Sequence, residues 1–237
     1  REVLALLAPG SGQVYVDATA GLGGHAFAVA PHLGTAGTIL LNDLDPQNLG
    51  AAAQHVRALP SAPRVETIHG NFALLPHGLS QRGLRADMML ADLGFASSQV
   101  DDPARGLSFQ HDGPLDMRLD PPGPLTAQQI VSTWPSEEIE RIIREYGEDR
   151  LARLIARRIV GDREREPITS TSRLAAIVRR AYAAVGNRSE HVDPATRTFQ
   201  ALRIAVNDEL GNLEALLALI EAAAAGHASA PTWLAPG

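Results

Sequence analysis

Three aspartates are the residues of this chain best suited to hold a positively charged ligand. Asp17, Asp43 and Asp92 each end or directly follow a run of β-like residues. Because ligands of parallel sheets collect at the carboxyl ends of the strands, the three carboxylates are expected to face one crevice. Such a crevice attracts a cation and repels a phosphate group. The pattern therefore favours a cationic organic cofactor.

A glycine-rich turn lies between the first two of these aspartates. Gly21, Gly23 and Gly24 follow a predicted strand and open a predicted helix, a setting in which backbone N–H groups can approach a ligand closely. Asp43 lies 22 residues beyond Gly21, where a carboxylate can accept both ribose hydroxyls of a nucleotide. S-adenosylmethionine (SAM), which has a sulfonium and no pyrophosphate, fits this acidic site best. A dinucleotide cofactor is a second possibility, because Ala26 completes a G-x-G-x-x-A pattern. A tight turn that binds no ligand is a third.

The elements that must position these residues alternate along the first part of the chain. Strands are predicted at 14–17, 38–42, 64–69 and 87–92. Helices are predicted from residue 25, over 47–59 and near 72–82. This alternation predicts an α/β fold with a parallel sheet and crossover helices. The last strand is nearly all apolar, which indicates burial on both faces.

The rest of the chain is expected to be mainly helical. Residues 95–124 are rich in Gly, Pro and Asp and lack a clear period, so they predict a long functional loop. Helices are predicted at 126–133, 136–146, 149–161 and 172–185, followed by one long helix at 195–225.

Charge is unevenly distributed along the chain. The formal net charge is −6, yet residues 141–203 hold 14 arginines against 8 acidic residues, and the chain has no lysine. A basic segment within an acidic protein makes a polyanion a candidate partner. Arg153, Arg157 and Arg158 could follow an RNA backbone along one helix, or they form a solvated helix face.

The composition excludes several classes of protein. Because cysteine is absent, there is no disulfide framework, no thiolate zinc site and no catalytic thiol, and no metal site is expected. No apolar run reaches the roughly 18 residues that a membrane span needs. A cytoplasmic protein without a membrane partner is expected. Because the chain begins at Arg1 and ends in the short apolar stretch 233–237, we expect a fragment of a longer protein.

Seven sequence blocks occur in the order found in one known family. They are Asp17–His25 (DATAGLGGH), Asp43–Pro46 (DLDP), Gly70–Phe72 (GNF), Asp92–Gln99 (DLGFASSQ), Arg105–Phe109 (RGLSF), Asp112–Arg118 (DGPLDMR) and Pro194–Arg203 (PATRTFQALR). Together they resemble the bacterial small-subunit (16S) ribosomal RNA cytosine-N4 methyltransferases. The match runs along nearly the whole chain, and the last two blocks belong to few other proteins.

The resemblance implies a Rossmann-like SAM-dependent methyltransferase domain interrupted by an all-helical domain. The first part of the SAM-binding domain is expected at 1–110, a helical RNA-recognition domain at 111–193, and a return helix at 194–237. The four strands are expected in the order 3-2-1-4. The family's C-terminal strands would be missing, which leaves the fourth strand as an apolar edge.

The resemblance also implies roles for individual residues. By resemblance, SAM is contacted by Gly23, Gly24, His25, Asp43, Phe72, Asp92 and Gln99. Asp17 and Gly21 join this set on the charge and turn arguments above. The implied substrate is a cytosine in the decoding region of small-subunit ribosomal RNA, free or in the assembled subunit. Contacts to the RNA are expected from Arg105, Phe109, Arg118 and Arg197. Ion pairing within the loop would equally explain Arg105 or Arg118, and Arg197 could instead pair with Asp208 or Glu209.

Asp92 is the expected catalytic residue. Methyl transfer from a sulfonium is an in-line displacement, so the enzyme contributes mainly by aligning the nucleophile with the methyl group. The cytosine amine is a poor nucleophile, and a carboxylate that accepts its hydrogens favours the reactive form and relieves developing positive charge. Alternatively, Asp92 only binds the cofactor. Ser97 is the second catalytic candidate, although Ala96–Gln99 departs from the family's usual Ser-Ser-Pro-Gln and loses a hydroxyl and a stiff turn.

Two other functions stay open at this point. A non-catalytic ribosome- or RNA-binding remnant of the family would fit the missing strands. A nicotinamide-dependent oxidoreductase rests on the glycine pattern alone, because nothing further along the chain resembles a hydride-transfer site.

Overall fold

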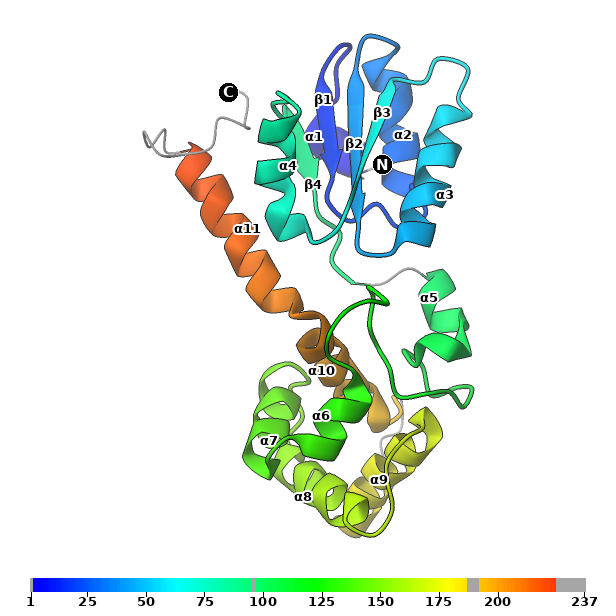
Figure 1. The fold of residues 1–237 in the computed structure, drawn as a ribbon, viewed down its shortest axis with the longest axis vertical. Helices are drawn as coiled ribbons and strands as arrows, with labels where there is room; N and C mark the ends of the chain where they lie inside the picture. The colour runs from blue at the N-terminus through cyan, green and yellow to red at the C-terminus, as the bar shows by residue number, and fades with distance from the viewer. Residues whose placement is uncertain (1, 95–96, 187–191, 225–237) are drawn as a thin grey trace. The chain divides into compact units, whose positions relative to one another are not determined.

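The chain forms two compact units. The computed structural model describes residues 2–94, 97–186 and 192–224. The first unit comprises Arg1–Gly94 with Leu210–Gly237, and the second comprises Phe95–Glu209 (Figure 1). The first boundary therefore lies before the one predicted at 110, and the second lies after the one predicted at 193.

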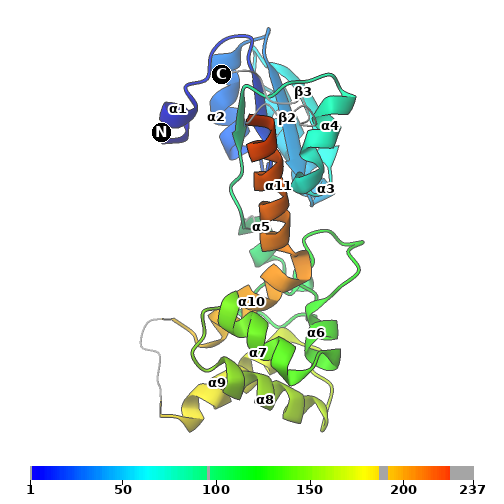
Figure 2. The ribbon, with the colours of Figure 1, turned by 90° about the vertical axis from the view of Figure 1, so that its left-hand side faces the viewer.

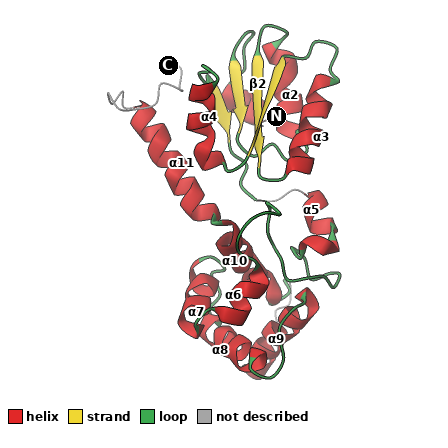
Figure 3. Ribbon diagram, in the orientation of Figure 1, coloured by secondary structure: helices red, strands yellow, loops and turns green. Residues whose placement is uncertain are grey.

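The first unit is built on a four-stranded parallel sheet, shown in yellow in Figure 3. Its strands are β1 (Val14–Asp17), β2 (Thr38–Asp43), β3 (Arg64–His69) and β4 (Met88–Leu90). The order is β3-β2-β1-β4, with Tyr15 of β1 paired to Ile39 on one side and to Met88 on the other. The predicted fold class and strand order are confirmed.

Helices cover both faces of this sheet. They are α1 (Glu2–Leu7), α2 (Gly24–Leu33), α3 (Pro46–Arg57), α4 (Leu75–Gln81) after the 3-10 turn η1 (Phe72–Leu74), and α11 (Glu209–Ala224). Successive strand residues point to opposite faces, so Tyr15 packs with α2 and α3, whereas Val16 packs with α4. Leu216 of α11 belongs to the same core cluster as Val16 of β1 and Leu75 of α4. Figure 2 shows the α11 helix alongside the sheet. The carboxyl ends of the strands thus carry the loops that follow β1, β2 and β4.

The fourth strand is shorter than predicted. It spans Met88–Leu90 rather than 87–92, because the backbone beyond Leu90 leaves the ladder. The N–H of Asp92 donates to the Thr19 hydroxyl at 2.7 Å instead of to a strand carbonyl. This departure carries Asp92 out of the sheet and toward the glycine turn.

The second unit is a helical bundle. Its elements are α5 (Ser97–Asp101), the 3-10 turn η2 (Pro103–Arg105), α6 (Ala127–Thr133), α7 (Ser136–Glu145), α8 (Ala152–Arg163), α9 (Thr171–Ala184) and α10 (Ala195–Asn207). One core joins α6 to α10, and it includes Ile142, Ile155, Val178 and Leu202. The loop predicted at 95–124 therefore contains two short helical elements.

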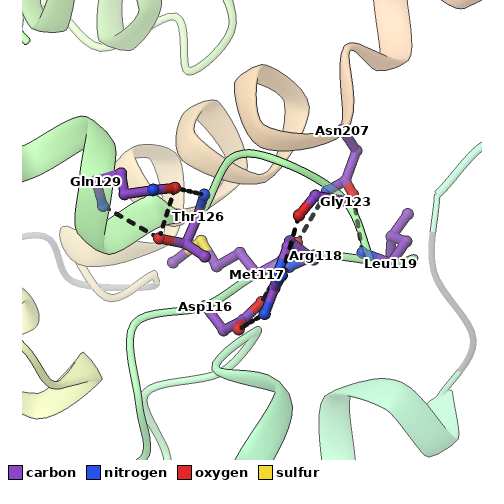
Figure 4. A network of polar contacts seen from close by, with 8 residues as sticks. All are labelled: Asp116, Met117, Arg118, Leu119, Gly123, Thr126, Gln129 and Asn207. Carbon is purple, nitrogen blue, oxygen red and sulfur yellow. Dashed lines mark hydrogen bonds and ion pairs between the residues drawn. The ribbon is translucent and has the colours of Figure 1, made fainter. Parts of the chain in front are cut away.

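The prediction of one long helix at 195–225 is wrong, because the helix ends at Asp208 and a second helix follows. This residue has a left-handed backbone (φ 47°) between α10 and α11, a conformation that aspartate tolerates better than most residues. The Asn207 side chain leaves the helix to bind the loop, accepting from the Leu119 N–H at 2.8 Å and donating to the Met117 carbonyl at 2.9 Å (Figure 4). A distant loop therefore sets the end of α10.

Candidate active site

The ends of β1 and β2 hold the glycine turn in place. The Asp43 carboxylate accepts the N–H of Gly21 at 2.7 Å through Oδ2 and the N–H of Asp45 at 2.8 Å through Oδ1. Burial raises the pKa of Asp43 above its ordinary value, and these two backbone hydrogen bonds oppose the shift. Each oxygen keeps a further acceptor lone pair. Asp43 is therefore clamped as an acceptor at the strand end, as ribose binding requires.

Gly23 and Gly24 of the turn differ in how much space surrounds them. Gly23, the residue before α2, has φ of +84°, and a Cβ there would meet the Cα of Ala52 at 2.9 Å. A Cβ at Gly24 would meet nothing within 4 Å. Gly23 is thus needed for folding of the turn, whereas Gly24 leaves open space beside the site.

We expect these two glycines to respond differently to alanine. Gly23→Ala should lower the free energy of unfolding by about 1–3 kcal/mol, because it adds a strained backbone and a clash with α3. Gly24→Ala should leave stability within about 0.5 kcal/mol and weaken binding of S-adenosylhomocysteine. Thermal unfolding and calorimetric titration of both variants check this, and equal affinities for Gly24→Ala and wild type would contradict the cofactor assignment of Gly24.

Asp17 is a buried carboxyl at the end of β1. It is 1% exposed, and it accepts from the Tyr15 hydroxyl at 3.2 Å and from the Thr19 N–H at 3.4 Å. Burial raises the pKa of Asp17 to about 6, while the hydrogen bonds and nearby His25 oppose the shift. A buried carboxylate short of positive charge is a site for a cation.

The raised pKa of Asp17 predicts pH-dependent cofactor binding. Its pKa is about 6 without ligand, and a bound cationic group lowers it. Affinity for S-adenosylhomocysteine should therefore rise with pH up to about 6, by up to tenfold per pH unit, and level off above. Stability should show the opposite trend, because the folded state binds this proton more tightly and loses that contribution as pH rises through 6. Asp17→Asn should weaken binding and flatten both profiles, and an unchanged affinity profile would remove Asp17 from the site.

Asp92 and His25 meet across the glycine turn. His25 stands in the first turn of α2, and its Nε2 lies 3.2 Å from Oδ2 of Asp92. The Asp92 side chain is 69% exposed, while its backbone is held by the bond to Thr19 described above. The structure therefore presents an anchored but accessible carboxylate to an incoming group.

Two residues of this site were missed by the sequence reasoning. One is Thr19, which holds Asp92. The other is Asn42 on β2, whose Nδ2 donates to the carbonyls of Ala18 and Gly70 at 3.0 Å each. Oδ1 of Asn42 is buried and has no partner among the described residues. An amide inside an otherwise apolar strand was the available signal.

These features fit SAM. The Asp43 carboxylate can accept hydrogen bonds from hydroxyls, and the buried Asp17 carboxylate favours a positively charged group beside it. Oδ1 of Asn42 is an acceptor to which no described residue donates. The open space at Gly24 admits a ligand beside the backbone. Phe72, also predicted to contact SAM, lies in the core cluster with Val16 and is 7% exposed, so it packs against the sheet and its adenine contact stays a prediction.

The remaining predicted residues lie in the second unit. Gln99 is buried there on α5, and the Ser97 side chain lies outside the described part of the chain. Nη2 of Arg105 donates to the Leu119 carbonyl at 3.2 Å, and Nη1 of Arg197 donates to the Glu148 carbonyl at 2.7 Å.

Arg118 and Phe109 also have partners within this unit. Arg118 binds both oxygens of Asp116, at 2.8 and 2.7 Å, and its Nη1 donates to the Gly123 carbonyl at 2.9 Å (Figure 4). Phe109 contacts Phe199 edge to face, with ring centroids 4.8 Å apart. The ion-pair alternative is confirmed for Arg118, and contacts of these residues to RNA stay predictions.

The fold and the site together define a class of protein. A parallel sheet in this order, with a glycine turn after β1 and carboxylates at the strand ends, is that of a Rossmann-like SAM-dependent methyltransferase. The sequence matches the MraW methylase family over residues 1–228. The chain belongs to this family.

Individual relatives agree with this assignment. "Ribosomal RNA small subunit methyltransferase H" of Acidothermus cellulolyticus is 47% identical over 225 residues, which cover 93% of this chain and 67% of that protein. The proteins of the same name from Geotalea daltonii and Thermomicrobium roseum are 45% and 44% identical, covering 90% and 99% of this chain and 68% of each relative. The chain thus spans about two thirds of the length of these relatives. The dinucleotide interpretation of the glycine turn is not favoured.

The described residues contain no candidate metal centre and no membrane-spanning helix. Among residues 2–94, 97–186 and 192–224, no group of three or more His, Asp or Glu side chains is placed to hold a metal ion. Over the same residues, no helix is long and apolar enough to cross a membrane.

Proposed function

We propose that this chain methylates the N4 amine of a cytosine in the decoding region of small-subunit ribosomal RNA. The observation that carries the proposal is the carboxylate of Asp92, which is exposed, anchored through its backbone to Thr19 and paired with His25 beside the glycine turn. The names of the relatives support ribosomal RNA as the substrate. We place the reaction in the cytoplasm, where small subunits are assembled, and take ribosomal RNA or the assembled subunit as the partner.

The first unit binds and orients the methyl donor. SAM, when bound, supplies a methyl group carried on a sulfonium. Asp43 accepts hydrogen bonds from ribose hydroxyls without losing its two backbone partners, which keep the glycine turn closed. Asp17 contributes negative charge for the cationic end, and Gly24 leaves room for it. The residues thus fix the position of the donor relative to Asp92.

Asp92 acts on the substrate amine. Its carboxylate accepts a hydrogen bond from the N4 amine, which favours the form whose nitrogen lone pair is less delocalised into the ring and therefore more nucleophilic. When N4 forms its bond to carbon, the amine must lose a proton. Asp92 receives that proton, and Nε2 of His25, 3.2 Å from Oδ2, is placed to pass it to solvent. Ser97 stays the second proposed catalytic residue, and its side chain lies outside the described part of the chain.

The decisive experiment is methyl transfer with product identification. The chain is incubated with methyl-labelled SAM and either a transcript of small-subunit ribosomal RNA or purified small subunits lacking the modification. Nucleosides are then analysed by mass spectrometry. We expect N4-methylcytidine at a single position. A methyl group at another atom would refute the assignment of the substrate amine.

The alternative of a non-catalytic RNA-binding remnant predicts a different result. It would bind S-adenosylhomocysteine or RNA without incorporating label into either substrate. Measuring both binding reactions in the same preparation separates this outcome from a chain that does not fold.

A further inference from the structure

We propose that three exposed arginines at the start of α8 dock the phosphate backbone of RNA, an inference that rests on the proposed function. Arg153 and Arg157 lie on α8, and their spacing of four residues puts them on one face of the helix. Arg150 lies in the turn that leads into α8. All three are exposed, whereas Ile155 and Ile159 on the opposite face are fully buried. We call Arg150, Arg153 and Arg157 the α8 arginine stripe.

Most other arginines that the structure describes in the second unit bind a carboxylate or a backbone carbonyl, whereas the stripe arginines, Arg158 and the exposed Arg165 do not. Seven arginines of the unit pair with carboxylates, namely Arg118, Arg141, Arg144, Arg173, Arg179, Arg180 and Arg203. The three stripe side chains make no hydrogen bond or ion pair with any residue that the structure describes. Their charges are therefore free to meet an external anion.

Arg158, which the sequence groups with Arg153 and Arg157, is not part of the exposed stripe. Arg158 is half-buried on the side of the helix, and its Nε is buried without a partner among the described residues. Arg150 takes its place in the exposed row. Glu164 lies on the same face two turns beyond Arg157, so the stripe covers the N-terminal part of α8.

Helix stability does not explain these cations. Positive side chains near a helix N-terminus are disfavoured by the helix dipole, and the first turn of α8 holds no acidic residue. The buried carboxylate of Asp149, the residue before Arg150, is bound by the Tyr182 hydroxyl at 2.9 Å and by the Leu151 N–H at 2.8 Å. Cations at this end of the helix therefore lower the stability of the folded protein, and a bound polyanion would offset that loss.

The surroundings favour RNA over an anionic membrane. Binding to a lipid surface requires apolar side chains beside the cations, and no large apolar side chain of α8 is exposed. The stripe places guanidinium groups in a row, with Arg153 and Arg157 about 6 Å apart along the axis at the helical rise per residue. A nucleic-acid strand presents repeated charges on a similar scale, and the arginine fork binds phosphate through two N–H groups.

The test compares two triple variants that remove the same charge. Arg150→Gln/Arg153→Gln/Arg157→Gln removes the stripe, and Arg141→Gln/Arg144→Gln/Arg180→Gln removes three ion-paired arginines of the same unit. Binding to a small-subunit ribosomal RNA transcript is measured from 50 to 300 mM salt. We expect the stripe variant to bind roughly tenfold more weakly, with a slope of log K against log salt reduced by about 2 to 3. The control variant should keep most of the wild-type slope.

Additional variants and binding measurements distinguish the possible outcomes of this test. An Arg→Lys triple variant of the stripe should restore the slope, because the charge is retained. Titration with S-adenosylhomocysteine checks that the first unit is intact in all variants. Equal slopes for the stripe and control variants would refute RNA docking by the stripe arginines and would leave the proposed function unaffected. Wild-type protein that binds the cofactor but no RNA would overturn both, and loss of binding to phosphatidylglycerol vesicles rather than to RNA would overturn the stripe's assignment.

Discussion

Replacing Asp43 by alanine is expected to weaken S-adenosylhomocysteine binding by roughly 100-fold or more. The carboxylate is the acceptor for the ligand's hydroxyls, and each hydrogen bond to a charged group is worth about 1.5–3 kcal/mol. The same change frees the N–H groups of Gly21 and Asp45, which the carboxylate now holds at 2.7 and 2.8 Å. The loss therefore combines missing contacts with a loosened glycine turn. Calorimetric titration of the wild-type and variant chains measures it.

Asp45→Ala is the matched control for this prediction. Asp45 lies two residues away and caps α3 by accepting the N–H of Gln47 at 2.9 Å. Its removal should lower the free energy of unfolding by about 1 kcal/mol and leave cofactor affinity within a few-fold of wild type. If both variants lose binding to the same extent, the effect of Asp43 is a general loss of structure and the clamp has no specific role.

Asp92→Asn is expected to lower kcat by roughly 1000-fold while changing cofactor affinity by less than tenfold. Asparagine keeps the size of the side chain, and the backbone bond to Thr19 at 2.7 Å is unaffected. The amide neither neutralises positive charge on the amine nor accepts its proton, and loss of general-base function costs about 10² to 10⁴ in rate. Single-turnover methyl transfer at saturating SAM separates this loss from binding.

Two further variants serve as controls for the Asp92→Asn prediction. Asp87→Asn changes an aspartate just before β4, which accepts the Val14 N–H at 2.7 Å, and should leave kcat unchanged. His25→Asn should reduce kcat by a smaller factor and alter its pH profile, because proton release from Asp92 is impaired. A large loss of cofactor affinity in Asp92→Asn, with kcat preserved at saturation, would make Asp92 a cofactor ligand and would leave the reaction without its base.

Much of the fold was accessible from local sequence patterns. Strand and helix periodicity is a property of neighbouring residues, so the four strands and their flanking helices could be predicted. The alternation of strands and helices predicted a parallel sheet, whereas the strand order came from the family resemblance. The aspartates at the strand ends could be grouped because ligands of parallel sheets collect at the carboxyl ends of the strands. Asp17 and Asp43 lie on neighbouring paired strands, with Asp17 in register with Leu41.

Other features depend on contacts between residues far apart in the chain. The end of α10 is decided by bonds from Asn207 to a loop about 90 residues earlier, and no local pattern signals that break. The free state of Arg150, and the partial burial of Arg158, depend on how α8 packs in the bundle.

The sequence by itself thus determined the class of fold, the glycine turn and the acidic character of the site, because these follow from residue type and short-range spacing. Only the tertiary structure decided which groups are held and which are free. It joins Thr19 to Asp92 and Asn42 to Gly70, and it leaves the Asp92 carboxylate exposed. Such pairings arise because folding brings distant polar groups to one edge of the sheet, where each must find a partner or face a ligand.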